Sequence, residues 1–452
     1  MNVMETKLST KEQFAIGLML FALFFGAGNM IFPPALGQAA GENVWIAVAG
    51  FLITGVGLPL LAVSAIARTG SDLQTLASRA HPLFGIIFTI VMYLAIGPLF
   101  AIPRTGTVSY EIGITPFLSE ELKSSNMPLA VYTIVYFALN LWLSINPSKL
   151  VDRIGKLLTP LLLAGLFVLI TKSIVTPMGE FQAPTDAYAQ SPFFKGFIDG
   201  YLTMDTIAAL VFGIIVINSI KDKGVSNNKA ISRICIRAGI IAVAGLAFIY
   251  VSLAYMGASS PEAIGYKDNG GAIVTAAAYH LFGTAGNVIL GAIITLACLT
   301  TSVGLLSSCA SYFSKLTPSI SYKTYAIIMS VFSTAIANVG LTNLIKISVP
   351  VLIVIYPLAI VLVALSFLHE KFNGRSEVYS GALLATGIVS IFDGLNNAGI
   401  DVNNVLIIFG KFLPFFSHGI GWLVPAIIGA IAGWIVSKIR GAKSETAINK
   451  VS

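Results

Sequence analysis

The sequence predicts an all-α polytopic membrane protein, and three observations support this fold class. Of the 452 residues, 56% are hydrophobic and only 10% are charged, and the mean hydropathy is +0.87. Soluble domains carry about 25% charged residues, so this chain has too few to form a water-facing surface. Apolar runs long enough to cross a bilayer, about 20 residues each, recur along the whole chain. We therefore expect a single integral membrane domain over residues 1–452.

The apolar runs divide into twelve predicted transmembrane helices. In chain order we place them at residues 12–38, 43–67, 82–110, 128–146, 151–175, 194–220, 230–256, 285–314, 323–339, 345–368, 377–398 and 414–437. Residues 176–193 contain three prolines and are predicted to form an outer loop. Residues 261–282 are predicted to form a loop and a short helix, which is either a lid or a simple connector.

The basic residues fix the predicted orientation. Most of the 27 Lys and Arg residues fall into loops on one side of the membrane, for example Lys221, Lys223 and Arg233. Because loops rich in Lys and Arg stay in the cytoplasm, both termini are predicted to be cytoplasmic. The same distribution accounts for the net charge of +7, so we predict no nucleic-acid partner.

The first predicted helix contains the segment FFGAGNMIFPPALG, which runs from Phe24 to Gly37. Glycine and asparagine tolerate positive φ better than most residues, so residues 26–29 favour an unwound turn. Pro33 and Pro34 remove two backbone donors and disfavour helix just before them. Unpaired backbone in lipid costs several kcal/mol per group, so we expect this break to line a cavity or a binding site.

The sixth predicted helix carries a second interruption. Gly200, Thr203, Asp205 and Thr206 lie in the middle of an otherwise apolar run. Asp205 is predicted to be the N-cap of a half-helix. An acid inside a membrane costs at least a few kcal/mol and is a functional candidate by default.

The two interrupted helices are separated by an odd number of spans, so they cross the membrane in opposite directions. This is the pattern of an inverted repeat. We predict two repeats of five helices, at residues 12–175 and 194–368, followed by two additional helices at residues 377–437. The paired breaks would expose backbone groups at the membrane midplane, where a zwitterion and a cation replace the missing helical bonds.

Three consecutive hydroxyl residues, Thr300, Thr301 and Ser302, interrupt the eighth predicted helix. Hydroxyls and backbone carbonyls are the neutral oxygen ligands that suit a hard monovalent cation. The alternative is that each hydroxyl bonds back to the carbonyl one turn earlier, as is common in membrane helices.

Arg104 lies inside the third predicted helix, directly after Pro103, which is expected to kink it. Glu111, seven residues later, lies on the same helix face and is a candidate partner for an outer gate. Asp205 is the other candidate partner of Arg104.

The segments FFGAGNMIFPPALG and GPLFAIPRTGTVSYE, together with the twelve-helix layout, resemble the branched-chain amino acid:cation symporters, the BrnQ-type carriers of the LIVCS family. The resemblance covers almost the whole chain. It implies uptake of leucine, isoleucine and valine across the bacterial plasma membrane, driven in many members by a Na⁺ gradient. No enzymatic activity and no cofactor are expected beyond this coupling ion.

A more distant resemblance, carried by GAGNMIFPP and ACLTT, is to the LeuT-type fold. It implies that the amides of Ala27 and Gly28, with Asn29 beside them, bind the substrate carboxylate. It also implies a sodium site formed by the following residues: Ala22, Phe25, Ala297, Thr300 and Thr301.

The resemblance implies alternating access, in which helices 1, 2, 6 and 7 rock against the rest. The substrate ammonium would meet the carbonyl end of the first half of helix 6, or Asp205. The remaining candidate substrate contacts are Met204, Thr206, Phe212 and Tyr93. Met204, Phe212 and Tyr93 would contact the apolar side chain of the substrate. The alternative is that these three are ordinary core residues.

Four other functions are alternatives to this one. A membrane enzyme would need a nucleophile, a base or a metal cluster at one depth, and only Asp205 and scattered hydroxyls are present. A channel would be expected to repeat a filter motif. A carrier of the same fold for another small solute, such as a nucleobase, and an H⁺-coupled amino acid symporter that uses Asp205 both stay open. The sequence does not predict the oligomeric state.

Overall fold

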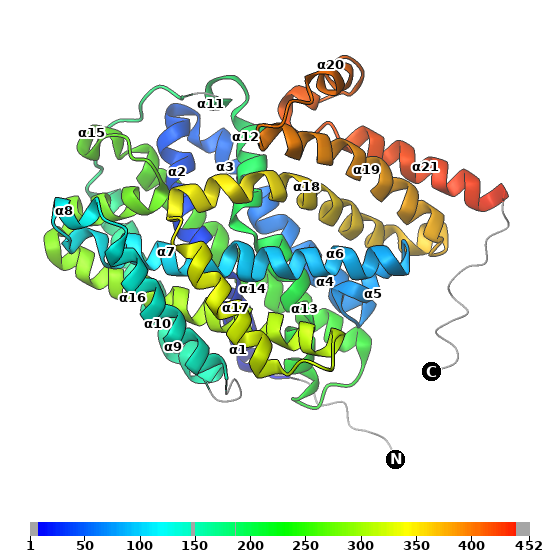
Figure 1. The fold of residues 1–452 in the computed structure, drawn as a ribbon, viewed down its shortest axis with the longest axis horizontal. Helices are drawn as coiled ribbons and strands as arrows, with labels where there is room; N and C mark the ends of the chain where they lie inside the picture. The colour runs from blue at the N-terminus through cyan, green and yellow to red at the C-terminus, as the bar shows by residue number, and fades with distance from the viewer. Residues whose placement is uncertain (1–7, 146–149, 186, 440–452) are drawn as a thin grey trace.

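A computed structural model describes residues 8–145, 150–185 and 187–439, and this part of the chain contains helices, turns and loops but no β-strand. Figure 1 shows an all-helical bundle in which α19 and α21 lie side by side at one end of the molecule. The two chain termini, which were predicted to be cytoplasmic, lie outside the described residues.

The first half of the chain folds into ten α-helices, and in several cases two consecutive helices are the two parts of an interrupted span. In order they are α1 (Thr10–Phe24), α2 (Ala27–Ala40), α3 (Val44–Leu52), α4 (Leu58–Thr69), α5 (Leu73–Ser78), α6 (Pro82–Leu94), α7 (Ala101–Gly113), α8 (Glu120–Lys123), α9 (Met127–Ser144) and α10 (Leu150–Val175). Short π-helical segments, η2 (Ile53–Gly57) and η3 (Ala95–Leu99), join α3 to α4 and α6 to α7.

Within the described residues, the second half contains eleven α-helices, and its division into a second repeat and two additional helices stays a prediction. Its helices are α11 (Ala187–Gln190), α12 (Pro192–Asp199), α13 (Asp205–Lys221), α14 (Asn228–Ala258), α15 (Pro261–Ile264), α16 (Gly270–Leu316), α17 (Tyr322–Ala337), α18 (Leu341–Leu368), α19 (Ser376–Asn397), α20 (Asn403–Phe412) and α21 (Leu423–Ile439). Two 3₁₀ segments matter below, η5 (Gly200–Thr203) after α12 and η7 (Phe416–His418) before α21.

Polar caps mark where several helices begin. Ser9 caps α1 by accepting the Glu12 amide, and the Glu12 carboxylate accepts the Ser9 amide in return, which satisfies two otherwise unpaired donors. Asn227 caps α14 and Asn269 caps α16 in the same manner with their side-chain oxygens. These caps lie at turns between helices, where the backbone amides have no partner in a preceding turn.

Helices α2 and α14 approach each other so closely that only glycine fits between them. A Cβ atom on Gly37 would lie 1.9 Å from the Ala254 carbonyl oxygen, and one on Gly257 would lie 2.1 Å from the Pro34 carbonyl oxygen. Gly196 has the same role between α12 and α3. Small residues allow this backbone-to-backbone packing, which is the main source of helix association in lipid.

The predicted span boundaries hold in most places, and two expectations fail. The third span is not kinked at Pro103 but at Gly97, whose backbone (φ −90°, ψ −123°) leaves the helical range within η3. The segment 261–282 forms α15, a loop and a short helix, as predicted; this short helix is the first part of α16, and non-helical Gly283 (φ 63°, ψ −156°) separates it from the eighth span. The last span begins at Leu423 rather than at residue 414, because residues 403–418 form α20 and η7.

By length and hydropathy, seven helices of the described residues can cross a membrane, or eight if the bent pair around Met204 is one span. The count of twelve spans therefore stays a prediction. The all-α membrane fold itself is present.

Candidate functional site

The first span is broken where the sequence predicted, but over a shorter stretch. Only Phe25 and Gly26 leave the helix, both in extended conformations with negative φ, and residues 27–29 already form the first turn of α2. The expectation of an unwound turn through Asn29 was wrong because the Asn29 side chain caps the new helix. Its Oδ1 atom accepts the Gly26 amide at 2.8 Å.

Pro33 and Pro34 lie inside α2, and the residues just before them are helical, in contrast to the prediction. The fixed φ of proline fits a helix, and the cost lies in the missing donors and in the crowding of earlier carbonyls. Both prolines are buried where α2 packs against α14, so tertiary packing holds the helix together. The first amides of α2, on Ala27, Gly28 and Asn29, thus mark a helix N-terminus within the protein interior.

The sixth span breaks at Met204, which adopts a left-handed conformation (φ 66°, ψ 13°) between η5 and α13. The two parts of this span are bent by 42°. Asp205 was predicted to be the N-cap, but Met204 takes that position and Asp205 is the first helical residue. A left-handed non-glycine residue costs about 1–2 kcal/mol, and such strain is typical of functional segments.

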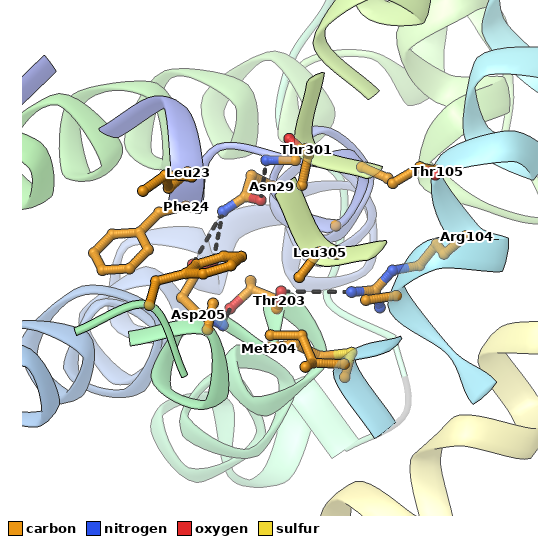
Figure 2. A pocket seen from close by; sticks show the side chains of 17 residues that line it. Leu23, Phe24, Asn29, Arg104, Thr105, Thr203, Met204, Asp205, Thr301 and Leu305 are labelled. Carbon is orange, nitrogen blue, oxygen red and sulfur yellow. Dashed lines mark hydrogen bonds between the residues drawn. The ribbon is translucent and has the colours of Figure 1, made fainter. Parts of the chain in front are cut away.

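The two breaks are joined by a buried polar cluster. Figure 2 shows Asn29 and Asp205 pointing towards each other, and the Asn29 amide nitrogen lies 3.0 Å from each carboxylate oxygen of Asp205. Tyr250 of α14 donates its hydroxyl to the same carboxylate and also contacts the Asn29 amide. All three side chains are at most 1% exposed. Sequence reasoning missed Tyr250, since one tyrosine in an apolar span carries no signal of its partner.

Arg104 reaches the other side of the sixth-span break. Its guanidinium donates to the carbonyl oxygens of Leu202 (2.7 Å) and Thr203 (3.4 Å), and it lies 5.2 Å from the ring centre of Phe32. The side chain is only 4% exposed. These carbonyls lie at the C-terminal end of η5, where the break removes their helical amide partners, so Arg104 supplies the missing hydrogen-bond donors.

The predicted pair of Arg104 with Glu111 does not form among the described residues. Seven residues along a helix correspond to about 10 Å, and the guanidinium finds nearer acceptors in η5. Glu111 is half-buried and lies beside Gly271 at the start of α16.

The predicted ion-binding residues bring four oxygen atoms together between α1 and α16. The Thr301 hydroxyl lies 3.1 Å from the Phe25 carbonyl and 3.1 Å from the Ala297 carbonyl. The Thr300 hydroxyl donates to the same Ala297 carbonyl at 2.7 Å, so the alternative expectation, a bond back to the carbonyl one turn earlier, holds for both Thr300 and Thr301. Ala22, the remaining predicted ligand, lies in the last turn of α1. The amide four residues later, that of Gly26, would be the helical partner of the Ala22 carbonyl but donates to Asn29 instead.

Ser302, the third hydroxyl, faces elsewhere. It accepts a hydrogen bond from Asn140 of α9. The run of three hydroxyls therefore divides into two that lie near the first-span break and one that joins two helices.

A cavity of about 30 Å³ lies between these groups. Of the predicted residues, it is lined by Ala27, Gly28, Asn29, Met204, Asp205, Phe212, Arg104 and Thr301. Lining residues that the sequence did not suggest are mostly apolar, because nothing in their pattern distinguishes a cavity wall from a core: Leu23, Phe24, Ile96, Ala101, Ala208 and Leu305, with the polar Thr105 and Thr203.

Two predicted substrate contacts do not line this cavity. Tyr93 stacks on Tyr312 with ring centres 4.1 Å apart. Thr206 donates its hydroxyl to the Thr54 carbonyl in η2 at 3.2 Å. Both side chains are engaged outside the cavity in this arrangement, and their contact with the substrate stays a prediction.

Comparison with known proteins shows what this arrangement is similar to. A family model described as branched-chain amino acid transport protein matches residues 9–440. The branched-chain amino acid permease BraB of Bacillus subtilis (strain 168) is 52% identical over 449 residues, which cover 99% of this chain and 100% of the relative. The branched-chain amino acid permease BrnQ of the same organism is 53% identical over 438 residues, which cover 97% and 99%.

Solved structures confirm the fold class. Mhp1, a nucleobase-cation-symport-1 family transporter in a closed conformation with bromovinylhydantoin bound, matches with a TM-score of 0.65 and 15% identity over 94% of this chain and 93% of its own. MhsT in complex with L-phenylalanine matches with a TM-score of 0.58 and 18% identity over 93% and 97%. At these identities the likeness establishes the LeuT-type fold alone.

Proposed function

This chain belongs to the family of branched-chain amino acid transport proteins, and we propose that it imports leucine, isoleucine and valine by Na⁺-coupled symport. The substrate class is supported by relatives above 50% identity that are branched-chain amino acid permeases and match over nearly their whole length. The membrane is that of a bacterial cell, and the chain acts as a carrier rather than as an enzyme.

The observation that carries the Na⁺ proposal is the group of oxygens around Thr301. Its hydroxyl oxygen lies 3.1 Å from the Phe25 carbonyl oxygen and 3.1 Å from the Ala297 carbonyl oxygen, and all three oxygens are neutral. Unwound backbone carbonyls of broken helices are the typical ligands of coupling cations in this kind of carrier. An ion here would bind α1 to α16 and so favour one arrangement of the two.

The substrate carboxylate is proposed to bind between the N-terminus of α2 and Arg104. The amides of Ala27 and Gly28 supply the positive end of a helix dipole. A Cβ atom on Gly28 would lie 2.9 Å from the Arg104 Nη2 atom, so the two elements converge on one point. A guanidinium has five donors, and the two carbonyls of η5 leave some of them for the substrate.

The substrate ammonium is proposed to meet Asp205. The carbonyls of Leu202 and Thr203, the other acceptors considered, already accept from Arg104. A carboxylate accepts about four hydrogen bonds, and Asn29 and Tyr250 do not use all of them. The apolar side chain then faces Met204 and Phe212.

Transport requires this site to widen, which supports alternating access. A cavity of about 30 Å³ holds one or two water molecules but no amino acid. Helices α2 and α14 are in direct backbone contact and are expected to move as one body against α7 and the part of α16 that follows the break at Gly283. The two breaks supply the hinges.

An H⁺-coupled mechanism is the second candidate, and the buried position of Asp205 favours it. Uptake of labelled leucine into proteoliposomes, with an inward Na⁺ gradient, an inward H⁺ gradient or neither, separates the two. We expect accumulation with Na⁺ alone, competed by isoleucine and valine but not by uracil. Accumulation driven by H⁺ and lost in Asp205→Asn, but not in the exposed control Asp401→Asn, would replace Na⁺ by H⁺ as the coupling ion.

A further inference from the structure

A second cavity, of about 360 Å³, lies between α10 and α16 and shares no lining residue with the central site. Figure 1 shows these two helices side by side. Three of the lining side chains, Val168, Phe282 and Ile289, are also exposed at the surface of the bundle. The cavity is therefore a groove that opens outwards, and in a membrane-spanning chain this surface faces the lipid.

The wall of the groove is entirely apolar. It is made of Ala, Gly, Val, Leu, Ile and Phe side chains, with no polar residue among them. Water finds no hydrogen-bond partner there, and a zwitterion would bury its charges without compensation. An unfilled groove would lose the dispersion contacts that its walls make with a packed neighbour. The groove is thus suited to a hydrocarbon chain.

A cation lies at one end of the groove. Lys172, in the last turn of α10, follows the lining residues Val168 and Leu169 by one turn on the same helix face. It is half-buried, and no carboxylate of the described residues forms an ion pair with it. In the predicted orientation Lys172 lies at the outer surface of the membrane.

The length of the groove matches one leaflet of a bilayer. Ala164, which lines the groove, and Lys172 are eight residues apart, so they are separated by about 12 Å along the axis of α10. The hydrocarbon of one leaflet is about 15 Å thick, half of the whole core. A lipid chain that lies along the groove would therefore bring the phosphate of its head group to the depth of Lys172.

The groove also crosses the bend of α16. Phe282 lines it before the bend at Gly283, and Ala285 lines it after the bend. The first part of α16 is in close contact with α2, because a Cβ atom on Gly270 would lie 1.7 Å from the Ile31 carbonyl oxygen. An occupant of the groove thus contacts both parts of α16 and fills the angle between them.

We propose that this groove binds an acyl chain of an anionic phospholipid of the outer leaflet, and that the lipid phosphate contacts the Lys172 ammonium. Basic side chains near a membrane surface attract anionic lipids. A zwitterionic lipid carries its own cation beside the phosphate and gains less from the lysine. The site is separate from the central cavity, so the proposal depends neither on the transported substrate nor on the coupling ion.

Photo-crosslinking tests the proposal. The purified full chain in nanodiscs of phosphatidylcholine receives a trace of phosphatidylglycerol or phosphatidylcholine with a diazirine in its acyl chain, and adducts are located by peptide mass spectrometry. Peptides that cover residues 163–169 and 278–293 should be labelled about fivefold more by the phosphatidylglycerol probe, the effect of one lysine near a membrane surface. The exposed residues Val331 and Phe332 of α17 should be labelled equally by both probes.

Variants separate the chain from the head group. Ala164→Phe and Ala285→Phe each fill the groove from its exposed rim and should abolish labelling of the groove, whereas Ala335→Phe, on the exposed surface of α17, should not. Lys172→Gln should make the two probes label the groove equally. The control Lys346→Gln, at an exposed position outside the groove, should keep the preference for the anionic probe.

The proposal is overturned if the parent groove is labelled no more than α17, or equally by the two probes. Labelling that survives both groove-filling variants, or a preference that survives Lys172→Gln, would also overturn it. A crosslink between two copies of the chain at these peptides would assign the groove to a second copy instead. Since Ala164 and Ala285 belong to different helices, either filling variant decides if the other fails to fold.

Discussion

Replacing the Thr301 hydroxyl tests the ion site most directly. Thr301→Val keeps the shape of the side chain and removes the one oxygen that lies 3.1 Å from both the Phe25 and the Ala297 carbonyls. Removal of one polar contact to a charged group costs about 1.5–3 kcal/mol. Since about 1.4 kcal/mol corresponds to a factor of ten, the Na⁺ concentration for half-maximal uptake should rise about tenfold to a hundredfold.

The assay is the initial rate of labelled leucine uptake into proteoliposomes over a series of external Na⁺ concentrations. Thr301→Ser, which keeps the oxygen, should stay close to the parent. Ser302→Ala is the matched control from the same run of hydroxyls, because Ser302 bonds to Asn140 and not to the break. If Thr301→Val keeps the parent's Na⁺ dependence within twofold, or if Ser302→Ala shifts it equally, the ion does not bind at these oxygens.

Three further substitutions probe the frame of the site. Gly257→Ala places a Cβ atom 2.1 Å from a backbone carbonyl of α2 and should abolish folded protein in size-exclusion chromatography. The control Gly245→Ala, whose Cβ atom meets only a side chain at 3.1 Å, should not. Equal yields of folded protein for the two variants would contradict the backbone contact. Asn29→Ala leaves the buried Gly26 amide without an acceptor and should lower the free energy of unfolding by about 1–3 kcal/mol; an unchanged melting temperature would argue against the cap. Arg104→Lys replaces a guanidinium that donates to two carbonyls by an ammonium that cannot bridge both, and it should lower kcat/KM for leucine about tenfold or more. Parent-like uptake would show that Arg104 does not act in the substrate site.

The breaks in the first and sixth spans were predictable because their signals are local. Glycine and asparagine within an apolar run, and a lone carboxylate at midplane depth, have few other uses in a membrane helix. Local rules also singled out the hydroxyls of Thr300 and Thr301, whereas their place beside the first break was implied by the fold resemblance. The same rules failed at Pro33 and Pro34, since packing against α14 overrides the intrinsic preference of proline.

Partners across the bundle were not predictable. Tyr250 lies more than forty residues from Asp205, and Arg104 about one hundred residues from η5, so only the packed fold brings them together. The pairing of Arg104 with Glu111 failed for the same reason, while the contact of Tyr93 with the substrate stays a prediction. A sequence indicates which residues are unusual, and the arrangement of helices decides what each one meets.

The charges of the central site have an electrical consequence. With Asp205 ionised, its buried carboxylate and the buried guanidinium of Arg104 sum to zero, and a zwitterionic amino acid adds nothing to that sum. Under the proposed coupling, the loaded carrier moves with the charge of its sodium ion and returns without one. A potential of 100 mV, negative inside, supplies about 2.3 kcal/mol per charge. Membrane voltage alone would then concentrate leucine about fiftyfold per sodium ion, even in a cell without a sodium gradient.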